Sequence, residues 1–335
     1  MKLLEKCHLL FFLLGAAIGY PQERDSLAVL KTATPYIEHY DEYISTRIGF
    51  NNNFNRFKFN VSDLHLKYFM TPNQRIRTTF SFLFRFIEFD IGFTPSFLKF
   101  NRDDELHGKT TFSSLGTQLY FGQWMQTLQW NTTKGYYVDA RDLGLAEDSN
   151  IIFPDVKIRK VGGSSSYIFN PNYSFRAINK QKEWQGKSAG SFVPTFSYYF
   201  THVSDATPGT NKIYNLAIGP GYYYNWVIAG HFLVSAGGFM GIGYNNTGFE
   251  FTDDREDYKV DGITYETEFK MTLAHNTSHF FTGASISISS FYHKIDPTVR
   301  YTDQQEFFEF YLGYRFKAPE KIMKKITNVE KKLGL

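Results

Sequence analysis

Apolar and polar residues alternate along successive short segments between about residue 75 and residue 317. In the segment 305–317, every second residue from position 308 onward is large and apolar, while the residues between them include Glu309 and Arg315. Successive side chains of a β-strand point to opposite faces, so each segment has one apolar and one polar face. A closed sheet of such strands has an apolar exterior and a polar interior. This is typical of barrels that cross an outer membrane.

The joins between these segments also follow a pattern, because tight joins alternate with long ones. Short periplasmic turns and longer outer loops produce this pattern in outer-membrane barrels. The sequence therefore predicts an all-β, transmembrane, antiparallel up-and-down barrel of twelve strands, with ten to fourteen compatible with the pattern. The stretch 60–73 fits either an extra short strand or a structured first loop. The predicted strands are residues 43–59, 74–84, 86–95, 110–121, 124–138, 165–179, 191–203, 213–225, 230–244, 263–274, 278–292 and 305–317.

The N-terminus carries an export signal. Lys2 and Lys6 precede an apolar run over residues 9–18, and Ala17-Ile18-Gly19 fits a cleavage site. The run is too short to span a bilayer as a helix, although a buried N-terminal helix is an alternative. We therefore predict a signal peptide over residues 1–19, a periplasmic segment over 20–42, the barrel over 43–317 and a C-terminal extension over 318–335. The only cysteine, Cys7, falls within the signal peptide, so the mature chain has no disulfide or cysteine metal site.

Composition supports a barrel rather than helical spans. Aromatic residues make up 19% of the chain, and Tyr and Trp favour the membrane–water boundary. Mean hydropathy is only −0.34, as expected if the lumen side and the loops are polar. Net charge is +3 with no basic stripe, which argues against nucleic acid as a partner. The sequence thus predicts an exported protein located in the outer membrane of a Gram-negative envelope.

The C-terminal extension combines apolar and basic residues at helical spacing. Ile322, Met323 and Ile326 belong to its apolar face, and it also contains Lys321 and Lys324. A basic amphipathic helix of this kind is compatible with the inner leaflet of the outer membrane. A frayed, solvated tail is equally compatible with the sequence.

Charged residues on the non-lipid parity form a candidate polar cluster in the lumen. Both signs are present, so a self-neutralising network is favoured over a ligand or ion pathway, because buried charges need partners. The candidate residues are Arg75, Arg77, Arg85, Glu88, Asp90, Glu266, Glu268 and Lys270.

A second group of residues carries a family resemblance. Arg176-Ala177 is followed by a turn whose residues are Gln181, Trp184, Gln185, Lys187, Ser188, Ala189, Gly190 and Ser191. This stretch resembles a signature of domain-of-unknown-function family 4421, and the similarity extends from about residue 36 to 320. The resemblance implies an outer-membrane barrel without an assigned activity. The turn itself fits three roles: docking a periplasmic partner or peptidoglycan, plugging the lumen, or a plain structural turn.

Signs of catalysis or metal binding are weak. The histidines of 275–279 lie beside hydroxyls in a predicted tight turn without an evident orienting acid. The acidic loop 253–257 lacks the spacing of a calcium site. We therefore predict no catalytic residues, no metal and no cofactor.

Three functional hypotheses follow from the sequence. The first is a non-enzymatic envelope protein, either a small-solute channel or a structural or partner-binding barrel. The second is an outer-membrane enzyme that modifies lipid or peptide, and the third is a soluble periplasmic barrel that binds an apolar ligand. The expected partners are outer-membrane lipids and the barrel-assembly machinery. That machinery would recognise the aromatic closing strand ending at Phe316.

Overall fold

The computed structural model describes residues 36–333, apart from residues 86, 99–100, 146–149, 180, 207–208 and 296–297. The predicted signal peptide, Cys7 and most of the predicted periplasmic segment lie outside the described residues. The described chain is almost entirely antiparallel β-sheet. In the first half the strands are β1 (Ile37–His39), β2 (Tyr43–Val61), β3 (Leu66–Thr71), β4 (Arg77–Phe84), β5 (Ile87–Phe93), β6 (Thr111–Phe121), β7 (Trp124–Val138), β8 (Ile151–Tyr167) and β9 (Glu183–Gln185).

The second half continues the sheet. Its strands are β10 (Ala189–Phe192), β11 (Thr195–Ala206), β12 (Gly209–Gly219), β13 (Gly221–Ile228), β14 (Phe232–Phe251), β15 (Tyr258–Asn276), β16 (Phe280–Lys294) and β17 (Val299–Lys317). The helices are α3 (Asp104–His107), the 3₁₀-helix η2 (Ala140–Leu143), α4 (Arg176–Asn179) and α5 (Glu320–Leu333). Among the described residues, no helix is long and apolar enough to cross a membrane.

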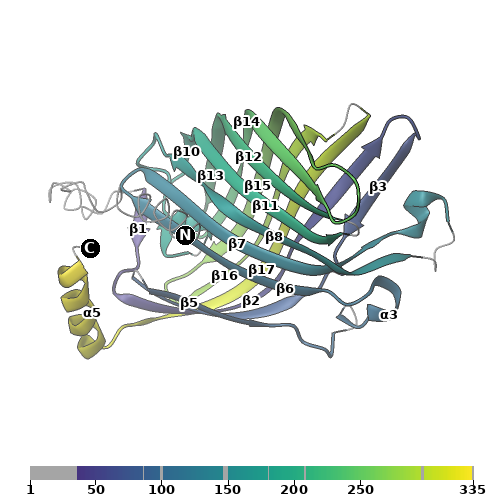
Figure 1. Cartoon of the computed structure of the whole chain (residues 1–335). Coiled ribbons are helices and arrows are strands. Elements are labelled where there is room, and N and C mark those ends of the chain that lie inside the picture. Colours follow the sequence, from purple (N-terminus) through teal and green to yellow (C-terminus); the bar gives the residue numbers. More distant parts are fainter. Residues whose placement is uncertain are drawn as a thin grey trace. The chain divides into compact units, whose positions relative to one another are not determined.

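The sheet closes on itself as a ring of ten strands in the described chain (Figure 1). Its order is β2, β3, β7, β8, β11, β12, β14, β15, β16 and β17, and β17 pairs back to β2 over 19 residue pairs. The ring is completed by a short pairing of β3 with β7 through Met70 and Thr71. The predicted barrel fold is confirmed, with ten strands in the ring rather than twelve.

The three predicted strands at 74–84, 86–95 and 110–121 exist, but they stand outside this ring. β4 pairs with β2 and β5, whereas β6 pairs with β7. No pairing joins β5 to β6 among the described residues. The stretch 60–73, which the sequence left open, supplies β3 and closes the ring in their place.

Two ends of the barrel differ, and we name them for what they contain. The plug end carries the tight turns after β6, β13 and β15, and it also holds the start of β2 and the end of β17, because Tyr43 pairs with Lys317. The hairpin end carries the joins after β11, β14 and β16. Three long loops predicted at 203–213, 244–263 and 292–305 are mostly strand, because these hairpins extend the sheet beyond the apolar region.

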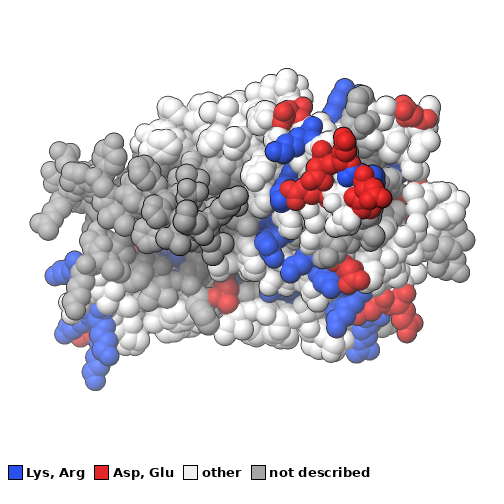
Figure 2. Space-filling model, in the orientation of Figure 1, with Lys and Arg blue, Asp and Glu red and all other residues white. Residues whose placement is uncertain are grey.

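The exterior of the barrel is apolar toward the plug end. Phe80, Ile286 and Phe308 are 50%, 40% and 51% exposed, whereas Glu266 on the opposite parity is 6% exposed. Charged side chains gather toward the hairpin end, and the neighbouring surface is largely free of them (Figure 2). The predicted assignment of faces therefore agrees with the structure over this region.

One predicted strand is wrong. The sequence placed a strand at 165–179, but the strand is β8 at 151–167, and the chain then leaves the wall. Residues after Tyr167 alternate in hydrophobicity because Tyr173, Phe175 and Ala177 pack inside the barrel, not because they lie on a sheet.

Candidate functional site: the filled lumen

A plug formed by residues 168–188 fills the plug end of the barrel. Its apolar side chains Tyr173, Phe175, Ile178 and Trp184 are each at most 4% exposed. They form one cluster with wall residues from β7, β10, β13, β14 and β15. The Trp184 Nε1 donates to the carbonyl oxygen of Gly230, 3.0 Å away, which ties the plug to the turn between β13 and β14.

The two glutamines of the signature turn hold the plug in place. Gln181 donates from Nε2 to the Tyr311 hydroxyl at 2.6 Å, and its own carbonyl accepts from Arg315 at 3.1 Å. The Gln185 Oε1 accepts from the Ser174 amide and from Asn225. Both glutamine side chains are fully buried. The signature therefore lies mainly in the plug, and its last residues, Ala189 to Ser191, begin the wall strand β10.

The segment that precedes the barrel completes the plug. β1 pairs with β9, and the Tyr36 carbonyl accepts from the Gly186 amide at 2.7 Å. The Arg315 guanidinium lies 3.9 Å from the ring centroid of Tyr40, whose hydroxyl accepts from Asn276. Residues 36–40 thus run across the plug end and fasten the plug to the wall.

An ionisable pair connects β1 to β9. The His39 Nδ1 lies 3.2 Å from the Glu183 Oε1, and this hydrogen bond raises the pKa of His39 above its ordinary value of 6.5. Burial alone would raise the pKa of Glu183. The hydrogen bonds from His39 and Ser174 and the charge of Arg176 outweigh burial, so that pKa lies below its ordinary value of 4.5.

Two buried ion pairs lie inside the lumen, one between non-adjacent strands and one between neighbouring strands. Lys160 on β8 and Asp303 on β17 are 2.8 Å apart with side chains 4% and 2% exposed, and Asp303 also accepts from Asn55. Arg47 and Glu309 are likewise 2.8 Å apart on the paired strands β2 and β17. Within each pair the two charges neutralise one another, as isolated charges inside the barrel would be costly.

The hairpin end of the lumen is filled by apolar side chains instead. Phe57, Tyr136 and Tyr301 are at most 5% exposed, and the Phe57 and Tyr301 rings stack with centroids 5.7 Å apart. Val156, Ile158, Val203 and Ile213 complete this cluster. We call these seven residues the upper core. The lumen is therefore occupied at both ends and charged in the middle.

A polar cavity of about 150 Å³ remains between the plug and the ion pairs. Glu266, Glu268 and Lys270 line it together with hydroxyl groups from β7, β8 and β11. Glu268 accepts from the Tyr223 hydroxyl at 2.8 Å and lies 3.1 Å from Lys270, while Glu266 accepts from Ser197. These three predicted lumen residues do lie together inside the barrel.

The other predicted lumen residues do not join them. Arg75 pairs with Asp104 of α3, and Arg85 lies in the β4–β5 turn, where it pairs with Glu330 of α5. Arg77 lies over the ring of Phe112 on β6, with its Cζ 5.6 Å from the ring centroid, and Asp90 is exposed on β5. The Glu88 side chain lies outside the described part of the chain. Arg75 and Arg85 fall beyond the ends of the regular strand, where parity no longer determines which side a residue faces.

Sequence reasoning missed the residues that form the central ion pairs. Arg47, Glu309, Lys160 and Asp303 each lie on the inward parity of their strands. Lys160 and Asp303 are 143 residues apart, and β8 was displaced in the predicted strand pattern. The only available signal was a charge on the inward parity, and that signal does not identify its partner.

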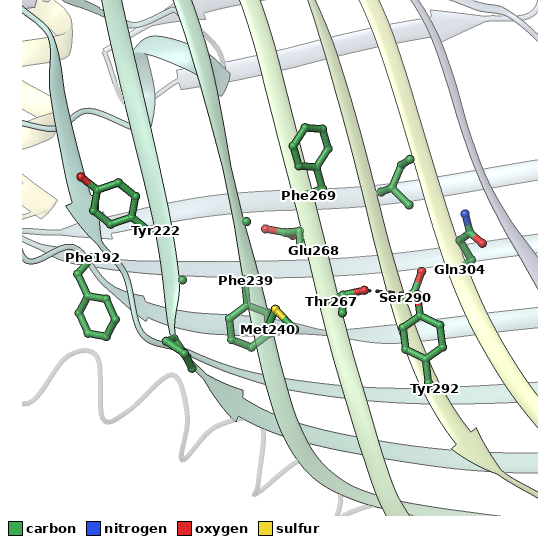
Figure 3. A pocket seen from close by; sticks show the side chains of 14 residues that line it. Phe192, Tyr222, Phe239, Met240, Thr267, Glu268, Phe269, Ser290, Tyr292 and Gln304 are labelled. Atoms are coloured by element: carbon green, nitrogen blue, oxygen red, sulfur yellow. Dashed lines mark hydrogen bonds between the residues drawn. The ribbon is translucent and has the colours of Figure 1, made fainter.

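A groove of about 640 Å³ crosses the wall formed by β10, β13, β14, β15 and β16 (Figure 3). Phe192 and Tyr222 lie on one side of it, Tyr292 on the other, and Phe239 and Met240 between them. The exposed members of the lining belong to the apolar exterior and are Phe192, Tyr222, Met240, Phe269 and Tyr292. The groove is therefore a depression of the barrel wall, where small residues such as Gly221 and Gly238 thin the surface.

The remaining candidates for chemistry carry little structural support. Ser278 and His279 are 2.8 Å apart in the exposed turn between β15 and β16. The structure places no group of three or more His, Cys, Asp or Glu side chains suitable for a metal among the residues it describes.

Comparison with solved structures gives distant similarities. The translocator domain of the autotransporter NalP from Neisseria meningitidis is 8% identical, with a TM-score of 0.34 and coverage of 93% of this chain and 98% of that chain. OmpT of Vibrio cholerae is 10% identical, with a TM-score of 0.29 and coverage of 84% and 100%. OprG of Pseudomonas aeruginosa is 9% identical, with a TM-score of 0.19 and coverage of 84% and 99%.

Comparison at the sequence level gives a family. No curated protein matches the chain. A family model, "Domain of unknown function (DUF4421)", matches residues 24–316. That range contains the whole barrel wall except Lys317, together with the plug and its signature turn, and it confirms the resemblance seen in the sequence. The chain therefore belongs to the DUF4421 family.

Proposed function

We propose that this chain is a non-enzymatic outer-membrane barrel with an occluded lumen, which acts as a structural or partner-binding protein rather than as an open channel. The apolar exterior and the charged interior support the membrane location, because an exterior of this kind is stable against hydrocarbon and not against water. The tight turns support a periplasmic position for the plug end, because such barrels usually have short periplasmic turns.

The occluded lumen is the observation that carries the proposal. A solute entering from the hairpin end meets the upper core, then the Lys160–Asp303 and Arg47–Glu309 pairs, and finally the plug. The polar cavity between these layers is about 150 Å³, and the buried layers on either side of it separate it from both ends of the barrel.

The accessible surface of the plug is where a periplasmic partner or peptidoglycan would bind. Gly186, Lys187 and Ser188 are exposed, in contrast to the buried Gln181, Trp184 and Gln185. The buried set keeps the plug folded. In the exposed set, the Ser188 hydroxyl accepts from the Val227 amide and the Lys187 ammonium lies 5.5 Å from the Tyr36 ring centroid, so these residues are held in a defined position at the accessible surface. Partner binding at this surface therefore requires no opening of the lumen.

Planar-bilayer recording of the reconstituted full chain tests the proposal. We expect no steady ion conductance from the wild-type protein. We also expect none after residues 170–187 are replaced by a short Gly-Ser turn, because the upper core still blocks the hairpin end. Conductance should appear only when that replacement is combined with Phe57→Ala and Tyr301→Ala. Reproducible conductance steps from the wild-type protein would refute the occluded barrel.

Two further measurements address the other functional classes. Carbonate-washed membranes should retain the protein, whereas a soluble periplasmic barrel would be extracted. The mass profile of lipid A should be the same in a deletion strain and its parent. An altered profile would favour the lipid-modifying enzyme instead.

A further inference from the structure

Helix α5 packs against the outside of the barrel rather than across its lumen. Met323 and Ile326 contact a small buried cluster formed by Ile44, Phe84 and Ala318. The Arg85 guanidinium binds Glu330 and donates to the Thr327 hydroxyl at 3.1 Å. These contacts lie along one stripe of the helix, at spacings of three and four residues, so α5 is held in a defined rotation about its axis.

The contact site lies at the foot of the apolar exterior. Ile44 pairs with Phe316, and Phe84 follows Phe82 by two residues on the same face of β4. Phe316 and Phe82 are each 38% exposed on the outer wall, whereas Ile44 and Phe84 are 3% and 2% exposed because α5 covers them. The helix therefore lies at the plug-end border of the surface that faces lipid.

The two remaining stripes of α5 differ in chemistry. Ile322 and Val329, seven residues apart on one stripe, are 40% and 41% exposed although they are aliphatic. Lys321, Lys324 and Lys331 form an exposed stripe with Asn328, and Lys325 lies between the two stripes. The lysines of α5 form the isolated group of positive charge at the lower left of Figure 2.

We propose that α5 binds the anionic phospholipid headgroups of the periplasmic leaflet. Ile322 and Val329 insert at the level of the acyl chains, and the lysine stripe contacts the phosphates. A basic stripe beside an exposed apolar stripe favours an anionic lipid surface, and the position at the foot of the lipid-facing wall places both stripes at that surface. The inference rests on the outer-membrane location proposed above, but it does not depend on whether the lumen is occluded.

Spin labels on the full-length reconstituted protein test this arrangement. The only native cysteine is Cys7, so Cys7→Ser allows single labels at Val329→Cys and Asn328→Cys. In nanodiscs containing phosphatidylglycerol, the label at 329 should be more accessible to oxygen and the label at 328 to a water-soluble nickel complex. A label at Ile322→Cys should repeat the result at 329, which protects the test if one variant folds poorly.

The charge dependence provides the second half of the test. Replacing phosphatidylglycerol by phosphatidylcholine should lower the oxygen preference at 329 severalfold, and Lys324→Gln with Lys325→Gln should reduce this lipid dependence. The matched control changes two exposed lysines at the hairpin end, Lys67→Gln with Lys259→Gln, and should leave it intact.

The outcomes separate the two proposals. A label at Ile286→Cys reports whether the wall of the barrel is in contact with lipid. If the label at 286 is lipid-exposed while labels at 322 and 329 remain water-accessible in both lipids, the role of α5 is refuted and the membrane location stands. If the label at 286 is also water-accessible, the location itself fails. A lipid response at 329 that is undiminished by Lys324→Gln with Lys325→Gln would refute headgroup recognition.

Discussion

Truncating Trp184 should release the plug without unfolding the barrel. The Trp184 side chain is 3% exposed and packs in the plug cluster, and its Nε1 donates to the Gly230 carbonyl. Replacing a buried tryptophan by alanine costs about 3–5 kcal/mol. The hydrogen-bonded strands of the wall are untouched, so the loss falls on the equilibrium between the seated and the displaced plug. Since every 1.4 kcal/mol is a factor of ten, the displaced population should rise by about 100- to 4,000-fold.

Hydrogen exchange measured by mass spectrometry reports this population directly. Peptides from residues 170–187 should exchange faster by that factor in Trp184→Ala, while peptides from β15 and β16 should keep their wild-type rates. The matched control is Trp226→Ala. Trp226 is on β13, next to the plug-bonded Asn225, but its side chain is 46% exposed on the outer wall. The same deletion there should change plug exchange by only a fewfold. Equal plug exchange in Trp184→Ala and wild type would refute the account of how the plug is held.

Three further predictions concern a buried ion pair in the lumen, the pairing of β1 with the plug, and a glycine at the irregularity in the β7–β8 register. Lys160→Met should destabilise the barrel by about 3–5 kcal/mol in urea unfolding from liposomes, because it leaves the Asp303 carboxylate buried without its cation. Protonated His39 stabilises the docking of β1 fully below pH 6.5, and this stabilisation is lost as the pH rises through the raised pKa of His39. The hydrogen-exchange protection of the amides of residues 183–186, corrected for intrinsic exchange rates, should therefore fall as the pH rises above that pKa. Gly135→Ala should cost about 1–3 kcal/mol, measured in the same urea unfolding, since φ is +91° and a Cβ would lie 2.2 Å from the Lys109 carbonyl oxygen.

Each of these has a control within the chain. Adding Asp303→Leu to Lys160→Met should recover most of the lost stability, and a double variant less stable than the single one would contradict a paired-charge role. His39→Gln should remove the alkaline fall in protection, and an unchanged fall would assign the titration to another group. Gly262→Ala should be nearly neutral, because a Cβ there meets nothing within 4 Å and φ is not positive. Equal costs at 135 and 262 would show that strain is not the cause.

Alternation in the sequence was sufficient to predict strands wherever one face meets an apolar surface and the other a polar lumen. Strands β4, β5, β15, β16 and β17 were found for that reason. This alternation fails to identify a strand where charged residues face outward and apolar residues face inward. On β8, Lys157 and Arg159 are on the outward parity, while Val156 and Ile158 point inward into the upper core. Because the outward residues of this part of β8 are charged, the search for an apolar outward face missed the strand. The predicted strand was therefore shifted to residues 165–179, most of which belong to the plug.

The plug was also only partly predictable. Residues 181–191, most of which belong to the plug, stood out as a family signature, but the burial of Gln181 and Gln185 cannot be predicted from the residue type, because glutamine is usually exposed. Their hydrogen bonds join them to Tyr311 and to Asn225, residues 130 and 40 positions away. Such pairings depend on closure of the ring, so they become visible only once the register between strands is known.

The outward residues along the strands also give the height of the apolar band on the barrel exterior. On β17 the outward residues from Phe316 to Phe308 are apolar, and the next outward residue, Glu306, pairs with Arg56 at 2.6 Å. Eight steps of about 3.3 Å, tilted by about 40°, rise roughly 20 Å, close to the roughly 25 Å apolar band of outer-membrane barrels. Above that level the outside is charged and the upper core is apolar, which is the arrangement of a soluble barrel. One continuous sheet therefore has an apolar exterior and a polar interior toward the plug end, and a charged exterior and an apolar interior toward the hairpin end. The upper core closes the lumen because the hairpin end, like a soluble barrel, needs an apolar core of its own.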